Sequence, residues 1–346
     1  MNEINPQDPE NMAGYIKSLP RDLENAWRLG SEAPLPPFPK IEKMLISGMG
    51  GSAIGGDLFG RYLSTIAPVP VVSHRDYGLP SWARGSETLV VCSSHSGNTE
   101  ETLSSFEAAL ERGCSLLAIS TGGTLQRRAL EAGIPHWQFN HVGQPRTAIG
   151  WSFGLLLALA ERLELVQGQQ QEIDEAVLIM ERQHTLLAPS VPLLENAAKR
   201  LAGQLLERNV VIFAAGEVEV IARRWKGQFN ELAKAWASFE GIPEMNHNTL
   251  AGLVFPESLL EKTSAIFLRS PLDHPRNQKR IDLSMQFFLQ AGVMVDSVMA
   301  SGEGRLAQLW SLLQFGDFVS YYLALAYGID PTPVEALDAL KAALAD

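Results

Sequence analysis

Two glycine- and hydroxyl-rich turns lie where the sequence pattern of this chain changes from strand to helix. The first is "ISGMGGSAIGGD", residues 46–57, in which Gly50 and Gly51 follow a predicted strand and Ser52 opens a predicted helix. The second is "SSHSGNTEET", residues 93–102, which follows the apolar run "TLVVC". The amino end of a helix offers unpaired main-chain N–H groups and the positive end of the helix dipole. Both turns are therefore suited to bind an anion.

The second turn has the more specific chemistry of the two. Its hydroxyl side chains Ser94, Ser96 and Thr99 surround Gly97 and Asn98. A neutral cup of hydroxyl and amide donors suits a phosphate monoester, which brings two negative charges and several acceptor oxygens. We therefore predict that Ser94, Ser96 and Thr99 bind phosphate. The alternative is that Ser96 or Asn98 only caps the helix, which explains one hydroxyl but not three.

The first turn has a second interpretation, as a dinucleotide-binding fingerprint. Gly48, Gly50 and Ala53 match the loose form of the G-x-G-x-x-G/A motif. That motif also requires an acidic residue near the end of the next strand, where this chain reads "SHRD". The nicotinamide interpretation is the weaker one, and we expect no cofactor.

Strand and helix patterns alternate twice along the chain, each time with a glycine at the turn. Continuous apolar strands separated by helices indicate parallel sheets covered on both faces, an α/β architecture. The second series repeats the plan of the first, which predicts two similar sheets in tandem. The predicted strands are residues 43–47, 69–74, 88–94, 115–120, 136–140, 210–216, 264–270 and 293–299.

The same patterns predict four segments. Residues 1–40 form an N-terminal helical segment, and 41–165 form a first α/β domain that binds the anion. Residues 166–208 form a helical linker, and 209–346 form a second α/β domain that ends in a last helix.

Composition narrows the class of function and the compartment. The formal net charge of −11 disfavours nucleic-acid binding, which requires clustered Lys and Arg. Cys92 and Cys114 are the only cysteines, which predicts neither a disulfide framework nor a metal-binding cysteine motif. The acidic N-terminus does not resemble a signal peptide, and the apolar run 148–160 is too short to cross a bilayer. We expect a cytoplasmic protein with no membrane or nucleic-acid partner.

Three stretches carry a resemblance to a known family. "SSHSGNTEET" resembles the phosphosugar-binding signature of the SIS (sugar isomerase) domain. Together with "GMGGSAIGGD" and "PEMNHN", it makes the chain, from about Ile41 to Leu344, similar to the bifunctional phosphoglucose/phosphomannose isomerases of archaea and bacteria. The resemblance implies two tandem SIS-type, flavodoxin-like, three-layer αβα domains. His95 and Thr249 depart from the family pattern, which often has an aromatic and an acidic residue there.

Glu231 is the candidate general base. It lies on a predicted helix over residues 218–236, whose apolar face includes Leu232 and Trp236. A carboxylate on the apolar side of a helix is suited to this role. Spacing alone favours a surface glutamate paired with Lys234 at i+3. The resemblance reverses that choice, because the catalytic glutamate of the family aligns with Glu231.

The resemblance implies three further catalytic residues. His247, between two asparagines, matches the histidine that opens the sugar ring and that related enzymes contribute to the neighbouring subunit, which implies a homodimer. Arg146 matches an active-site arginine that would stabilise the charge of an enediolate. Its alternative is a surface arginine at a helix start, an electrostatically unfavourable place for a cation. Lys341 resembles a C-terminal active-site lysine, although without the resemblance it reads as solvated.

The resulting hypothesis is a metal-independent aldose–ketose isomerase. It would interconvert glucose 6-phosphate or mannose 6-phosphate with fructose 6-phosphate through a cis-enediol(ate). Gly50, Gly51 and Ser52 would hold the sugar hydroxyls or the reacting oxygens, and Thr332 could line the site. A non-catalytic phosphosugar-binding regulator and an amino-sugar phosphate isomerase are the alternatives.

Overall fold

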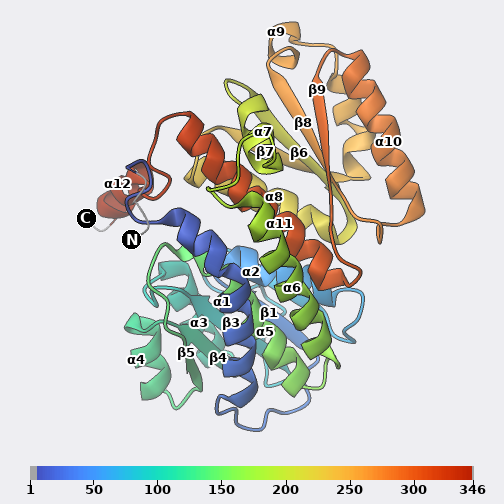
Figure 1. Ribbon diagram of the computed structural model, residues 1–346. Helices are drawn as coiled ribbons and strands as arrows, with labels where there is room; N and C mark the ends of the chain where they lie inside the picture. Colours follow the sequence, from blue (N-terminus) through green and yellow to red (C-terminus); the bar gives the residue numbers. More distant parts are fainter. Residues whose placement is uncertain (1–5, 345–346) are drawn as a thin grey trace. The chain divides into compact units, whose positions relative to one another are not determined.

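The computed structural model describes residues 6–344, and the chain divides into two compact units (Figure 1). One unit is residues 18–177, and the other consists of the described parts of 1–17 and 178–346. The divisions fall inside two helices, α1 (Met12–Glu32) and α6 (Gln169–Leu187). The four-segment division made from the sequence stays a prediction.

The unit of residues 18–177 is built on a parallel sheet of five strands in the order β2-β1-β3-β4-β5. Its apolar strands β3 and β4 are almost completely buried, as expected for a sheet with helices on both faces. The strands are β1 (Lys43–Ser47), β2 (Val71–His74), β3 (Thr88–Ser94), β4 (Ser115–Ser120) and β5 (His136–Gln138).

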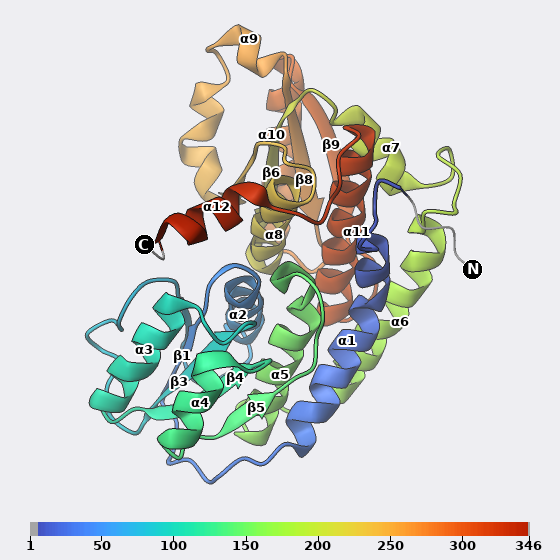
Figure 2. The same cartoon turned by 90° about the vertical axis from the view of Figure 1, so that its left-hand side faces the viewer.

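Helices cover both faces of this sheet (Figure 2). On one face, α3 (Glu100–Glu111) and α4 (Gly123–Glu131) bury Phe106 and Leu125 against β3 and β4. On the other face lie α2 (Gly50–Leu63), α5 (Ile149–Arg162) and part of α1. A short 3-10 helix, η1 (Pro145–Thr147), leads into α5. The predicted α/β architecture with parallel strands is confirmed.

The strand order places a topological switch point between β1 and β3. The chain leaves β1 toward β2 on one side, whereas β3 is followed by β4 on the other side. Crevices for ligands form at such points, outside the carboxyl ends of the strands. Both predicted anion turns lie there, because one follows β1 and the other follows β3.

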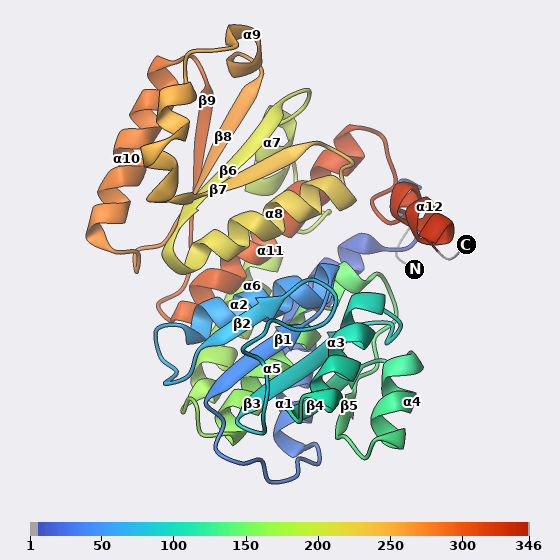
Figure 3. The ribbon, with the colours of Figure 1, turned by 180° about the vertical axis from the view of Figure 1, so that it is seen from behind.

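The other unit contains a parallel sheet of four strands in the order β7-β6-β8-β9 (Figure 3). One face packs against α10, where Ile281 and Phe288 meet Phe213 and Phe267. On the other face lie α7, α8 and α11. The elements are α7 (Ala197–Gln204), β6 (Asn209–Ala215), η2 (Gly216–Val218), α8 (Glu219–Glu231), β7 (Ala237–Ile242), η3 (Glu244–His247), η4 (Thr249–Gly252), α9 (Glu257–Leu260), β8 (Thr263–Arg269), α10 (Pro275–Gln290), β9 (Met294–Met299), α11 (Arg305–Ala326) and α12 (Glu335–Leu344).

The structure corrects the sequence analysis between α8 and η3. The helix predicted over residues 218–236 ends at Glu231, and β7 was not predicted. Lys234 adopts a left-handed backbone with φ of 52°, and its ammonium donates to the carbonyls of Glu231 and Leu232. A cation that binds the last carbonyls ends a helix favourably. Trp236 therefore lies beyond the helix, with 81% of its surface exposed, and not on its apolar face.

A buried polar clamp fixes α8 against α11. Arg224 binds the carboxylate of Asp317 through Nε at 3.2 Å and Nη2 at 2.8 Å, and Gln228 donates to the same carboxylate at 2.9 Å. The indole of Trp225 donates to a main-chain carbonyl of α11 at 2.9 Å. Gly316 allows this approach, since a Cβ there would overlap the indole. The clamp sets the rotation of the helix that ends at the candidate base.

We expect Gly316→Ala to lower the free energy of unfolding by about 1–3 kcal/mol, because the buried indole has no space to move into. Gly203→Ala in α7 is the matched control. An added Cβ there meets nothing within 4 Å, so the alanine should be neutral or stabilise the helix by up to about 1 kcal/mol. Urea unfolding of the two variants measures the difference, and equal values would contradict the packing argument.

Candidate active site

The hydroxyl turn after β3 is held by its own amides. The N–H of Gly97 donates to Ser94 Oγ at 3.0 Å, and the N–H of Asn98 donates to Ser96 Oγ at 3.2 Å. Ser94 Oγ lies 2.8 Å from Thr99 Oγ1. The sequence analysis expected these two amides to donate to a ligand. The structure shows instead that serine oxygens occupy both of them. Because the amides occupy acceptor positions on the serine oxygens, they leave the proton of Ser96 and one of the two protons of the Ser94–Thr99 pair to donate to an anion.

The capping interpretation of this turn is wrong. Helix α3 begins at Glu100, and its N-cap Thr99 makes no side-chain capping bond. The side chain of Asn98 instead accepts from the N–H of Thr124 on α4 at 3.0 Å. The amino end of α3 therefore keeps main-chain N–H groups for a ligand at the switch point.

The glycine turn after β1 has similar properties. Helix α2 begins at Gly50, whose φ of 51° suits glycine, and its N-cap makes no side-chain capping bond. A Cβ at Gly51 would overlap the carbonyl of Pro145, so only glycine lets η1 pack against the start of α2. Ser52 is buried in the same turn. Glycine here brings together two segments almost a hundred residues apart.

Arg146 lies in η1 and is buried, with 4% of its surface exposed, so the surface interpretation is wrong. Its Nη1 lies 3.5 Å from Gln144 Oε1. The contact between Gly51 and the Pro145–Arg146 peptide places this arginine next to the glycine turn. The first unit therefore brings together a hydroxyl turn, a glycine turn and a buried cation.

Two side chains that were given no role from the sequence belong to the same cluster. His141 joins His95 in the hydroxyl turn to Thr147 in η1, with nitrogen and oxygen contacts of 3.0 and 3.3 Å. Their position in the chain, six residues apart and on either side of "GQPR", was the available signal. The contact of His141 with His95 depends on tertiary structure.

The other unit carries Glu231 and His247, which lie beyond opposite ends of strand β7. Glu231 is half-buried at the end of α8, just before the amino end of β7. His247 is exposed in η3, just after the carboxyl end of β7. The six residues of β7 span about 20 Å, so these two side chains of one chain do not meet.

Lys341 lies on α12 with 77% of its side chain exposed, and its ammonium is 3.6 Å from Asp338. Thr332 is fully buried, and its N–H donates to Asp330 at 2.8 Å. The carbonyl of Asp330 also accepts from Lys234, so the chain before α12 is attached to the end of α8.

The second sheet has its own switch point, between β6 and β8, but its chemistry is acidic. Glu217 after β6 forms an ion pair with Arg305, and Asp273 follows β8. Asp273 accepts from the N–H of Ser270 at 3.2 Å. Burial, with a smaller contribution from the nearby Glu217, raises the pKa of Asp273 to about 6, although the N–H of Ser270 and the cation of Arg269 act in the opposite direction. Two carboxyl groups disfavour a phosphate dianion, so we assign the anion site to the first sheet.

Asp273→Asn should increase stability in a pH-dependent way. Its carboxyl keeps a proton up to about pH 6 in the folded chain, whereas the reference value is 3.8. The wild-type free energy of unfolding therefore falls as the pH rises from about 4 to 6. Asparagine removes that loss, so the variant should gain on the order of 1–3 kcal/mol at pH 7 and little at pH 4. Urea unfolding across this range measures it, and a pH-independent difference would refute the assignment.

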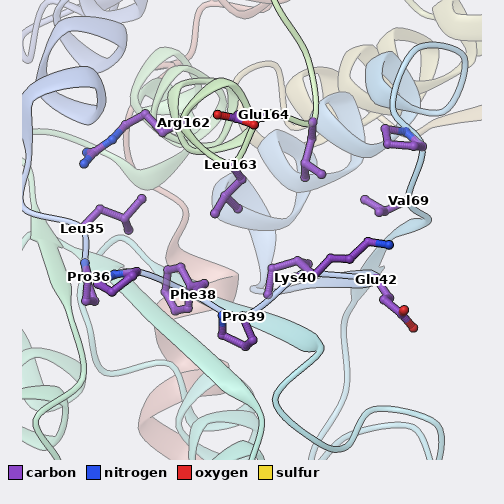
Figure 4. A pocket seen from close by; sticks show the side chains of 14 residues that line it. Leu35, Pro36, Phe38, Pro39, Lys40, Glu42, Val69, Arg162, Leu163 and Glu164 are labelled. Carbon is purple, nitrogen blue, oxygen red and sulfur yellow. The ribbon is translucent and has the colours of Figure 1, made fainter.

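A cavity of the first unit lies away from the switch point (Figure 4). This cavity of about 810 Å³ is lined by residues that precede β1 and β2 and by the end of α5, including Phe38, Lys40, Val69 and Arg162. It lies at the amino ends of the strands, whereas the anion turns lie at their carboxyl ends. We therefore locate the candidate site by the hydrogen-bond donors that converge at the switch point, and not by the size of a cavity.

Within the described residues 6–344, no three His, Cys, Asp or Glu side chains are grouped so that they could hold a metal ion. No helix in that part of the chain has the length and apolar character needed to cross a bilayer.

Comparisons with known proteins give the family. A bifunctional phosphoglucose/phosphomannose isomerase from Caldicellulosiruptor bescii is 38% identical over 96% of this chain and 98% of its own length. The chain belongs to this family. The enzyme of the same name from Aquifex aeolicus is 34% identical over 86% of this chain and 89% of its own length. The resemblance stated from the three sequence motifs is confirmed.

Two further comparisons concern the C-terminal domain and the fold. Residues 194–344 match the bacterial phospho-glucose isomerase C-terminal SIS domain. The crystal structure of a glucose-6-phosphate isomerase-like protein from Thermus thermophilus has a TM-score of 0.63 and 19% identity, covering 96% of this chain and 97% of that one. At this identity the likeness establishes the tandem α/β fold alone.

Proposed function

We propose that this protein interconverts glucose 6-phosphate or mannose 6-phosphate with fructose 6-phosphate. The observation that carries the proposal is the convergence of the hydroxyl turn, the glycine turn and Arg146 at the switch point of the first sheet. Two relatives with the family name are 38% and 34% identical to this chain over the aligned residues. We propose two aldose substrates because the name of these relatives includes both.

The chemistry follows from the residue types. The hydroxyls of Ser94, Ser96 and Thr99 hold the phosphate, and the free N–H groups at the start of α2 face the oxygens of the sugar. His247 moves the proton that opens the ring. Glu231 then carries a proton between C1 and C2, while the guanidinium of Arg146 stabilises the negative charge of the enediolate. Base, acid and cation suffice for this reaction, so the proposed mechanism is metal-independent, and Lys341 keeps its proposed place in the site.

The proposal includes a homodimer in which His247 acts in the site of the neighbouring subunit. Its support is the separation of Glu231 and His247 by the length of β7. A base and a ring-opening acid must both reach one hexose, which is shorter than that strand. A second copy of the chain can supply the missing histidine.

The proposed compartment is the reducing cytoplasm. Cys92 is buried and Cys114 is half-buried, and both thiols are free. Thiols persist in reducing compartments, where disulfides are rare.

Glu231→Gln tests the function and the base together. With fructose 6-phosphate as substrate and excess EDTA present, the wild-type protein should form both aldose phosphates. The glutamine variant should lose at least about 100-fold in kcat, because an amide accepts no proton from carbon. Inhibition by inorganic phosphate should stay near the wild-type value.

The matched control is Glu261→Gln, an exposed glutamate beyond α9, which should behave as wild type. Activity lost on adding EDTA would overturn the metal-independent mechanism. Hexose-phosphate binding without turnover by the wild-type protein would favour the regulator alternative.

Subunit complementation tests the shared site. Glu231→Gln and His247→Ala chains should each be nearly inactive alone. A mixed dimer has one site with both lesions and one site with neither, so it regains half of the wild-type activity. Random exchange of equal amounts forms mixed dimers as half of the population, which predicts about a quarter of wild-type turnover.

Coexpression with two affinity tags isolates the mixed dimer for this measurement. If both residues act within one chain, every site keeps a lesion and no activity returns. A monomer by sedimentation would also refute the shared site.

A further inference from the structure

Three side chains form a continuous hydrogen-bonded chain between two turns of the candidate site. His95 Nε2 lies 3.0 Å from His141 Nδ1, and His141 Nε2 lies 3.3 Å from Thr147 Oγ1. Thr147 Oγ1 donates to the carbonyl of Gln144 at 2.8 Å. The chain thus begins inside the hydroxyl turn after β3 and ends in η1, beside Arg146.

The geometry fixes the direction of every proton in this chain. The hydroxyl of Thr147 donates to Gln144, so it accepts from His141 Nε2–H. The neutral imidazole of His141 then presents a bare Nδ1, which accepts from His95 Nε2–H. One tautomer of each ring satisfies the whole chain.

The surroundings favour the neutral rings. Burial lowers the pKa of His95, and burial with the neighbouring His95 lowers the pKa of His141 to about 4. The ring of His95 also packs edge-on against Phe139, with centroids 5.9 Å apart, and Phe139 stacks on Trp151 of α5. Ring packing therefore holds the two imidazoles in place. Their N–H hydrogen bonds then link the position of the hydroxyl turn to the position of Thr147.

The hydrogen-bonded chain joins two parts of the site that must be placed relative to one another. His95 lies between Ser94 and Ser96, the proposed phosphate-binding residues, and its carbonyl is held by Thr121 through N at 3.0 Å and Oγ1 at 2.7 Å. Thr147 directly follows Arg146 in a single turn of 3-10 helix. A shift of about 1 Å in a charged group can cost about 100-fold in rate.

We propose that His95, His141 and Thr147 are positioning residues that couple the phosphate-binding turn to Arg146. They hold the guanidinium at the distance from the bound phosphate that the reacting carbons require. This proposal rests on the proposed function, in which Arg146 stabilises the negative charge of the enediolate. None of the three takes or gives a proton to the sugar.

Thr147→Val tests the proposal, since valine keeps the shape and removes the hydroxyl. We expect kcat to fall about 10- to 100-fold. KM and the inhibition constant of inorganic phosphate should change less than about threefold, because the hydroxyl turn keeps its own hydrogen bonds. Thr147→Ser restores the hydroxyl and should recover most of kcat. A merely structural role would lower the melting temperature and leave kcat of the folded protein unchanged.

Thr102→Val is the matched control. Thr102 is a fully buried threonine of α3 whose hydroxyl has no hydrogen-bond partner among the described residues. Its valine variant should keep wild-type kinetics and at least wild-type stability.

A double-mutant cycle tests the continuity of the chain. His95→Phe keeps a ring against Phe139 and removes the N–H donor. If the chain acts as one unit, the double variant with Thr147→Val should lose no more kcat than the worse single variant. Multiplied losses would show that the two residues act independently and would overturn the coupling.

These outcomes separate the two proposals. A wild-type protein without isomerase activity refutes the proposed function. An active wild-type protein with an equally active Thr147→Val variant refutes only the hydrogen-bonded chain.

Discussion

The rest of the structure depends on the divergence of two neighbouring parallel strands, β1 and β3. Their following turns meet at one edge of the sheet, and each turn leads into a helix whose first N–H groups lack an intrahelical partner. The contact between Gly51 and Pro145 brings η1 to the same place. These three segments, about fifty residues apart in sequence, form the proposed anion site, and Arg146 is its proposed cation.

The second sheet shows that the same topology does not by itself make an anion site. Its strand order repeats the divergence at β6 and β8, yet Glu217 and Asp273 occupy the corresponding turns, with Arg305 paired to Glu217. The proposed role of this unit is to carry the general base Glu231. The clamp of Arg224 and Asp317 fixes α8, which ends at Glu231.

Local patterns predicted much of this arrangement. The alternation of apolar runs and helices predicted the two parallel sheets, and the turns with Gly50 and Ser94 predicted the carboxyl edge of the first sheet, because turn chemistry is local. The prediction failed at β7, because Ser238, Glu240 and Gly241 interrupt the apolar residues of its sequence "ASFEGI". A strand of this kind is specified by its pairing with β6, which is a long-range property.

The sequence by itself determined the family and the chemical types at the site, since motifs such as "SSHSGNTEET" record side chains and spacing. Only the three-dimensional structure showed that the amides of Gly97 and Asn98 are occupied, in this case by serine hydroxyls two or three residues away. It also decided that Arg146 is buried and that His141 joins two turns. The physical reason is that hydrogen-bond partners and solvent exposure depend on segments distant in sequence, which no local pattern encodes.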